Sequence, residues 1–511
     1  MSMRSVDELS GSEPGASAVG IVPAVTPARG HRRAEKRLHA NASSLGHTAA
    51  ILAAFLASWG SMASAETAAL VRSVQASSPP AASSGTPPAS QSQQAVSFVI
   101  EKIVVEGVRH GSERIVVSEL LLTLGNAYTE AQLREALHRV KRLPFVVEAD
   151  FSLRRGSERG HFELVVTVSE AWPVFLGGSL AVVGLDDVFS NTDWSTFAAP
   201  EVGARVFFGG QSEATATVKG LVGSGVLPRD STVLFDAVYR HHNLFGRHVV
   251  GTVFVRTPEL FRRGYEIGAS LGVPLSRVST LDGTFLRSSR RVESTAFVPR
   301  YEETAHRADV AWRRDTTDDP FTPRLGSRLL SDLAYFTHES TIARAGAPWT
   351  NPGPPGSSEV WNHSSTGRGV GASLIARRYW PLSPRTSLGA GASLHGSITE
   401  YDTTATSAAE RQTWSSRNSG GGAGVEAEIL RTLPALGRGL TEFWWSAKAT
   451  FGVSLNRFEV ESRDTPLPYR INEFRVANSG LSLSLAARGR WGIARLELTW
   501  RHSFRPVNEL R

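Results

Sequence analysis

Residues 174–504 alternate between apolar and polar positions in many short segments. Leucines alternate with serines in residues 481–485, and apolar side chains alternate with charged or polar ones in residues 495–504. Stretches rich in Gly, Pro, Asn and Asp separate the segments. Because successive side chains of a strand point to opposite faces, each segment predicts a β-strand with one apolar and one polar face.

Strands of this kind suit a transmembrane β-barrel, in which lipid covers the outer face and water or packed polar groups fill the inside. Closure is compulsory, because an open strand edge in lipid would leave backbone groups unpaired. Roughly 340 residues at about ten per strand plus turns predict about 16 antiparallel strands, with 14 as an alternative. Several tryptophans near segment ends predict an aromatic girdle: Trp312, Trp380, Trp444, Trp445, Trp491 and Trp500. A soluble β-sandwich is the competing interpretation.

Residues 98–173 have a different pattern, which predicts a small α+β domain. A strand precedes a helix that ends near Gly125, and a second helix begins at a capping box, Thr129 to Gln132. Apolar residues at i, i+4 and i+7 follow in that helix, and Pro144 ends it. Two alternating segments come next, in residues 145–155 and 161–170. The predicted order is β-α-α-β-β.

The chain begins with a basic and then apolar leader. Basic residues crowd between Arg29 and Arg37, an apolar core runs from Ala49 to Trp59, and Ala63-Ser64-Ala65 follows. This order predicts a secretory signal peptide in residues 1–65, cleaved between Ala65 and Glu66. The apolar core is shorter than the about 20 residues of a spanning helix, although an uncleaved anchor remains the alternative. Residues 66–97, rich in Pro, Ser and Ala, predict a solvated linker.

Composition excludes some classes of site. The chain has no cysteine, which rules out disulfides, thiolate metal sites and thiol catalysis. Its net charge of +7 lies partly in the leader and gives no indication of nucleic-acid binding. The segment Gly268 to Gly272 matches the G-x-S-x-G nucleophile elbow, but no helix is predicted after it, as an elbow requires. We therefore expect no enzyme activity, no cofactor and no metal.

The segment RRDTTDDPFTPRLGSRL concentrates three carboxylates between two alternating segments. It lacks the ligand spacing of an EF-hand calcium loop. Prolines cannot donate to a strand ladder, and aspartates can accept bonds from nearby backbone N–H groups. The segment therefore predicts a turn between two barrel strands, built by Asp315, Asp318, Asp319, Pro320, Pro323 and Gly326.

Two parts of the chain resemble known families. The order of elements in residues 98–173, with Ile103 to Gly107 in the first strand and Leu124 to Tyr128 between the helices, resembles a POTRA domain. The segment Asp315 to Arg328 resembles the turn motif of the BamA/TamA family of outer-membrane barrels (the bacterial surface antigen family), and His242 to Arg247 resembles its N-L-F-G turn.

This resemblance implies an outer-membrane barrel, residues 174–511, that assists insertion or translocation of polypeptides, with the POTRA-like domain in the periplasm of a Gram-negative cell. The implied partners are unfolded outer-membrane or secreted polypeptides, outer-membrane lipid, and periplasmic chaperones or accessory lipoproteins. We expect a client to pair with an edge strand of the POTRA-like domain. The residues of that strand are Val147, Ala149, Asp150, Phe151, Ser152 and Leu153. The alternative is a structural or passive barrel whose small domain only docks a partner.

The chain departs from the family pattern in one paired feature. The family carries an R-G-F/Y tip on a long loop inside the barrel, and no such tip occurs between Thr399 and Ser419. The acidic partner of that arginine is also missing from the segment FWWSAKATFGVSLN. The paired absence indicates a diverged member with a mobile loop at residues 399–419, in which Arg411 is not an anchor.

Overall fold

The computed structural model describes residues 96–111, 113–187, 193–224, 232–258, 264–292, 300–345, 360–406, 411–434, 440–462 and 470–504. All of these ranges belong to one compact unit of the chain. The expected signal peptide, its cleavage site at Ala65 and Glu66, and the expected linker lie outside the described residues. No helix within the described ranges is long and apolar enough to cross a membrane.

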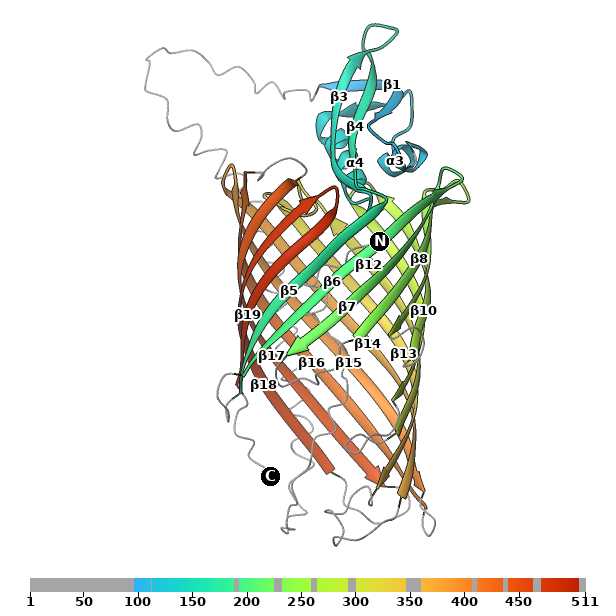
Figure 1. Cartoon of the computed structure of the whole chain (residues 1–511), viewed down its shortest axis with the longest axis vertical. Coiled ribbons are helices and arrows are strands. Elements are labelled where there is room, and N and C mark those ends of the chain that lie inside the picture. The colour runs from blue at the N-terminus through green and yellow to red at the C-terminus, as the bar shows by residue number, and fades with distance from the viewer. Residues whose placement is uncertain are drawn as a thin grey trace, which may run out of the picture. The chain divides into compact units, whose positions relative to one another are not determined.

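A small α+β domain comes first (Figure 1). Its elements are β1 (Ser97–Glu106), α3 (Glu113–Leu120), β2 (Ala127–Thr129), α4 (Glu130–Lys141), β3 (Val146–Arg155) and β4 (His161–Glu170). The sheet order is β2-β1-β4-β3, with β1 and β4 parallel and the other pairs antiparallel. The short strand β2 is an addition to the predicted order, because residues 127–129 pair with the start of β1 instead of only linking two helices.

The two helices pack on one face of this sheet. The capping box at Thr129 and Gln132 is present, and it satisfies backbone N–H groups at the start of α4. Leu133, Leu137 and Val140 of α4 are buried, as their spacing predicts. They pack in one hydrophobic core with Phe145, which directly precedes β3, and with inward-facing residues of β4 such as Val166. The domain therefore has its own core, against which Phe207 of the barrel also packs.

The rest of the described chain forms a closed β-barrel of fifteen strands, β5 to β19. Their bounds are β5 Val174–Asp187, β6 Asp193–Phe208, β7 Ser212–Ser224, β8 Thr232–Leu244, β9 Val249–Pro258, β10 Gly264–Ser276, β11 Ser279–Val292, β12 Arg300–Asp315, β13 Gly326–Ala345, β14 Val360–Ser383, β15 Thr386–Thr406, β16 Arg411–Leu433, β17 Leu440–Ser462, β18 Arg470–Gly489 and β19 Gly492–Phe504. The all-β barrel and the small domain before it are thus confirmed. The strand number differs from the expected 16.

The odd strand number has a consequence for closure. Each strand is antiparallel to its neighbour in sequence, so the first and last strands of an odd-numbered barrel must run parallel. Residues Ala494–Ser503 of β19 accordingly pair in parallel with Gly178–Asp187 of β5. Parallel pairing is slightly less stable per residue than antiparallel pairing. The seam that closes this barrel therefore differs in kind from every other ladder of its wall.

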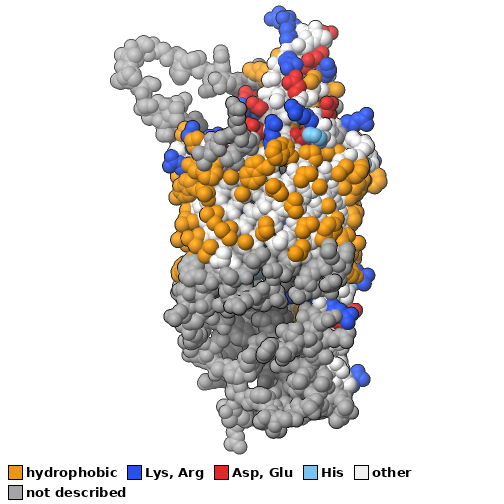
Figure 2. All heavy atoms as spheres, in the orientation of Figure 1, with side chains coloured by type: hydrophobic (Ala, Val, Ile, Leu, Met, Phe, Trp, Pro, Cys, Tyr) orange, Lys and Arg blue, Asp and Glu red, His pale blue; other side chains and the backbone are white. Residues whose placement is uncertain are grey.

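The alternation of the sequence matches the two faces of the wall. Leu481, Leu483 and Leu485 of β18 point outward and are exposed, while Ser482 and Ser484 accept or donate hydrogen bonds inside. Figure 2 shows the outward hydrophobic side chains as a band across the visible face of the barrel, below the small domain. The band has the arrangement that a lipid-covered surface requires.

The inner face of the wall is rich in paired charges. Arg377 of β14 and Lys448 of β17 both contact Glu426 of β16, at 2.9 Å for the lysine. One tryptophan of the expected girdle belongs to this face. Adjacent residues of a strand face opposite sides, so Trp444 shares the inner face with Ser446 while Trp445 points outward.

Candidate functional site: the acidic turn beneath helix α4

The turn between β12 and β13, residues 316–325, is held by its own aspartates. One oxygen of Asp318 accepts the N–H groups of Arg324 and Leu325, at 2.7 and 3.0 Å. One oxygen of Asp319 accepts those of Phe321 and Thr322, at 2.8 and 2.9 Å. Asp side chains commonly replace backbone acceptors in this way within turns.

The ends of the same turn are also fixed. Asp315 Oδ1 accepts from the Thr317 N–H at 2.9 Å. Gly326 adopts a φ of 106°, and a Cβ there would lie 2.3 Å from the carbonyl oxygen of Thr316. Only glycine accommodates both constraints without strain. The motif thus builds a turn, and it leaves one oxygen of Asp315 and one of Asp319 for other partners.

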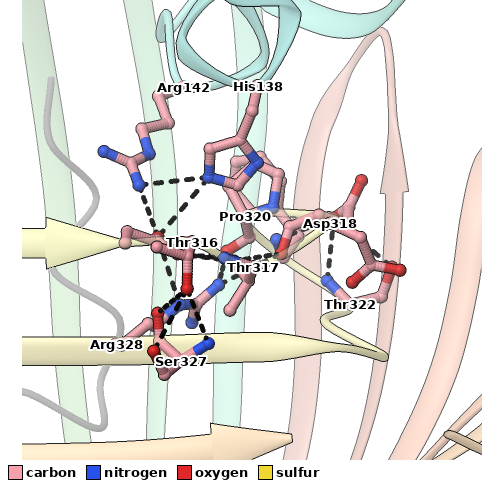
Figure 3. Close-up of polar contacts among 12 residues, drawn as sticks. His138, Arg142, Thr316, Thr317, Asp318, Pro320, Thr322, Ser327 and Arg328 are labelled. Carbon is pink, nitrogen blue, oxygen red and sulfur yellow. Dashed lines mark hydrogen bonds and ion pairs between the residues drawn. The ribbon is translucent and has the colours of Figure 1, made fainter. Parts of the chain in front are cut away.

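Those two oxygens contact the last turn of α4 (Figure 3). Asp315 Oδ2 lies 2.5 Å from Arg142 Nη2 and 3.5 Å from His138 Nε2, and Arg328 Nε of β13 approaches it at 3.3 Å. Lys141 Nζ lies 3.3 Å from Asp319 Oδ2. We call these six side chains the latch: His138, Lys141, Arg142, Asp315, Asp319 and Arg328.

Burial and charge both act on the latch. Burial alone would raise the pKa of the Asp319 carboxyl, but the hydrogen bonds from Thr322 and Phe321 and the charge of Lys141 together hold that pKa below its ordinary value. The stability that Asp319 contributes is therefore present above its ordinary pKa of about 3.9 and is lost as the pH falls through the lowered pKa. Burial also lowers the pKa of Arg142, against the opposing charge of Asp315.

The turn reaches well beyond its own hairpin. The Arg488 guanidinium of β18 lies 3.7 Å from the centre of the Phe321 ring, and its Nη2 donates to the Val146 carbonyl of the small domain at 2.7 Å. Ser387 at the start of β15 donates to the carbonyl of Pro323 at 2.8 Å. The turn therefore joins β12 and β13 to β15, β18 and the small domain at the inner side of one barrel end.

The small domain contacts four further hairpin turns of this barrel end. Phe145 packs against Phe207 beside the β6–β7 turn, with ring centres 5.1 Å apart. Ser118 Oγ lies 3.1 Å from His248 Nδ1 in the β8–β9 turn, which carries the N-L-F-G segment. Arg277 of the β10–β11 turn lies over the Tyr128 ring, and Arg490 of the β18–β19 turn donates to Ser169. Small domain and barrel are thus in contact around much of the rim.

The structure places the expected client-binding residues on β3, which lies at one edge of the small sheet and pairs only with β4. Val147 and Ala149 are buried, and Phe151 and Leu153 pack partly against the core. Asp150 and Ser152 are exposed on the opposite face. The edge strand and the acidic turn are separate features, and the structure does not bring them into one site.

The expected mobile loop at residues 399–419 is not a loop. Thr399 pairs with Asn418, and the ladder continues to Thr406 and Arg411, so most of this segment belongs to the β15–β16 hairpin. The resemblance implied a loop at this distance from the turn motif, but β14 to β17 each exceed 20 residues and extend past the apolar band. Arg411 is exposed, at the start of β16.

The basic half of the latch was not predicted. His138, Lys141 and Arg142 lie at the C-terminal end of α4. Cations in the last turn of a helix are favourable with its dipole and are common there, so they carried no specific signal. Arg328, the last residue of the turn motif, was the available clue. In the described part of the chain, no group of three metal-ligating side chains comes together.

Comparison with known proteins gives a limited result. No protein-family model matches the chain. No curated protein matches it either. Among solved structures, CdiB from Acinetobacter baumannii matches with 11% identity and a TM-score of 0.30, over 80% of this chain and 74% of that one. BamA from Haemophilus ducreyi lacking POTRA domains 1–3 matches with 10% identity and a TM-score of 0.28, over 80% of this chain and 85% of that one. Likeness at these TM-scores carries no argument about function.

Proposed function

We propose that this protein is an outer-membrane barrel of the BamA/TamA type that assists insertion or translocation of polypeptides. The small domain, which we take to be POTRA-like and periplasmic, would receive unfolded chains and present them at the barrel. Unfolded outer-membrane or secreted polypeptides are its proposed clients, with periplasmic chaperones or accessory lipoproteins as further partners. The turn motif and the order of elements in the small domain support this proposal.

One observation carries it furthest. The small domain keeps β3 as a sheet edge that pairs only with β4, while α4 and the start of β3 contact the rim of the barrel. A free edge can bind an extended peptide by adding a strand, with affinity from main-chain hydrogen bonds. A client strand held there would lie next to the barrel wall that it has to enter or cross.

The closed wall favours a second candidate. The ladder between β5 and β19 is continuous over ten residue pairs in the described chain, as expected of a barrel with a structural or passive role. In that case the small domain would only dock a periplasmic partner.

A photo-cross-linking experiment separates the two candidates. A photoreactive residue at Asp150 or Ser152, both exposed on β3, should form adducts with a urea-unfolded outer-membrane barrel protein added to the purified chain. The same residue at Thr167, exposed on the interior strand β4 and paired with both β1 and β3, is the matched control and should form few. Equal adducts at Asp150, Ser152 and Thr167 would exclude capture by the edge strand.

A further inference from the structure

Three alternate strands of the barrel wall, β12, β14 and β16, each carry an arginine on the outer face, near the small domain. Arg314 of β12, Arg378 of β14 and Arg431 of β16 each lie within the last six residues of their strand. Alternation places them outward, since Val310, Val370 and Val425 of the same strands point outward and are exposed. All three strands end at the rim that contacts the small domain.

Each arginine has a tryptophan beside it on the same face. Trp312 precedes Arg314 by two residues and donates from its indole to Ser279 at 2.8 Å. Arg378 lies 5.6 Å from the ring centre of Trp380. Arg431 is the direct cross-strand partner of Trp445 on β17. We call these six residues the arginine–tryptophan arc.

The positive charge of the arc is not neutralised by the wall. None of the three arginines forms an ion pair with a described residue. The other outward positions in the last six residues of these strands are Val310, Leu382, Ile429 and Leu433, besides the tryptophans, and none is acidic.

The arc covers one part of the rim only. At the same end of β5 and β6, the outward residues are apolar: Val174, Leu176, Val206 and Phe208 are all exposed. Figure 2, which faces these strands, shows the hydrophobic band running up to the small domain there. A ring of basic residues around the whole rim would also place arginines or lysines on the outer face of β5 and β6. The arc is therefore confined to one part of the rim.

From this geometry we infer that the arc is a binding site for anionic phospholipid headgroups in the leaflet next to the small domain. Lipid is what covers the outer wall of such a barrel. Tryptophan rings favour the level of the headgroups, and arginine forms paired, charge-assisted hydrogen bonds with phosphate. Unpaired arginines beside tryptophans therefore match a lipid with a net negative phosphate. Lipid bound at the arc, on one side of the barrel, would fix the depth and tilt of the barrel in the membrane.

Native mass spectrometry of the purified full chain in non-ionic detergent tests the inference. Phosphatidylglycerol and phosphatidylcholine with the same acyl chains are the two probes. The wild-type protein should retain phosphatidylglycerol preferentially. Basic residues at a membrane surface attract anionic lipid, so the variant Arg314→Gln, Arg378→Gln, Arg431→Gln should lose roughly tenfold or more of that preference.

The control variant removes the same charge from the small domain: Arg134→Gln, Arg154→Gln, Arg155→Gln, all exposed positions. It should retain the wild-type preference. Equal retention of both lipids by the wild-type protein would overturn the inference without any variant. An unchanged preference in the first variant, or an equal loss in the control, would also overturn it.

Discussion

Replacing Asp315 with alanine should release the small domain from the barrel rim. The side chain of Asp315 is only 14% exposed and is the common partner of His138, Arg142 and Arg328. Its removal leaves three basic groups close together with no carboxylate between them. Removing one partner of a buried ion pair costs about 3–5 kcal/mol, so this single change should weaken the docking of the small domain strongly.

Pulsed electron paramagnetic resonance can measure the release. The chain has no cysteine, so spin labels attach cleanly to Ser152→Cys in β3 and Arg385→Cys in the β14–β15 turn. The docked protein should give one narrow distance distribution, and Asp315→Ala should give a broad one. The matched control is Asp318→Ala. Asp318 lies in the same turn, but among the described residues its carboxylate bonds only Arg324 and Leu325, so its loss should keep the distribution narrow. A narrow distribution in Asp315→Ala would show that the latch does not hold the domain.

Locking the β5–β19 seam should stop client insertion. Leu180 and Leu496 are register partners across the seam, and both face outward. A disulfide between Leu180→Cys and Leu496→Cys would keep the first and last strands paired. If clients enter the membrane through this seam, the rate of client folding should fall to that of vesicles without the protein, and a reductant should restore it.

The matched lock lies one ladder away. Leu483 of β18 pairs with Leu498 of β19, also on the outer face, and a disulfide there leaves the seam free. Opening a ladder in lipid costs several kcal/mol for each unpaired backbone group. A client strand can offset this cost only at the ladder where it supplies new hydrogen-bond partners. Insertion through the seam should therefore depend on the β5–β19 ladder and not on the β18–β19 ladder. Full activity with the seam locked, or equal loss with either lock, would exclude the seam as the route.

Sequence patterns predicted the barrel well because its physics is local. Strands β18 and β19 each have one face toward lipid and one face toward the polar interior. The alternation of apolar and polar positions along their sequence follows directly from this requirement. The buried face of α4 was also predictable from the sequence, since Leu133, Leu137 and Val140 repeat at helical spacing. The roles of Asp318 and Asp319 as backbone acceptors follow from the chemistry of turns.

Features that depend on residues far apart in the sequence could not be predicted from local patterns. The strand count is a property of closure, and nothing within one strand distinguishes fifteen from sixteen. Residues beyond the lipid band lose their apolar face, so the pairing of Thr399 with Asn418 left no alternation to detect. The latch joins residues 138–142 to residues 315–328, and only the tertiary structure shows that two common features, a basic helix end and an acidic turn, meet.

The most direct test of the proposed function is the folding of a urea-unfolded outer-membrane barrel protein into phospholipid vesicles that contain the purified chain. Folding can be followed as the growth of the heat-modifiable, faster-migrating band in unboiled gel samples. We predict a higher rate than in vesicles that contain an equal amount of an unrelated closed barrel without a small domain. Equal rates in the two kinds of vesicle would contradict a role in polypeptide insertion and leave the passive barrel as the function.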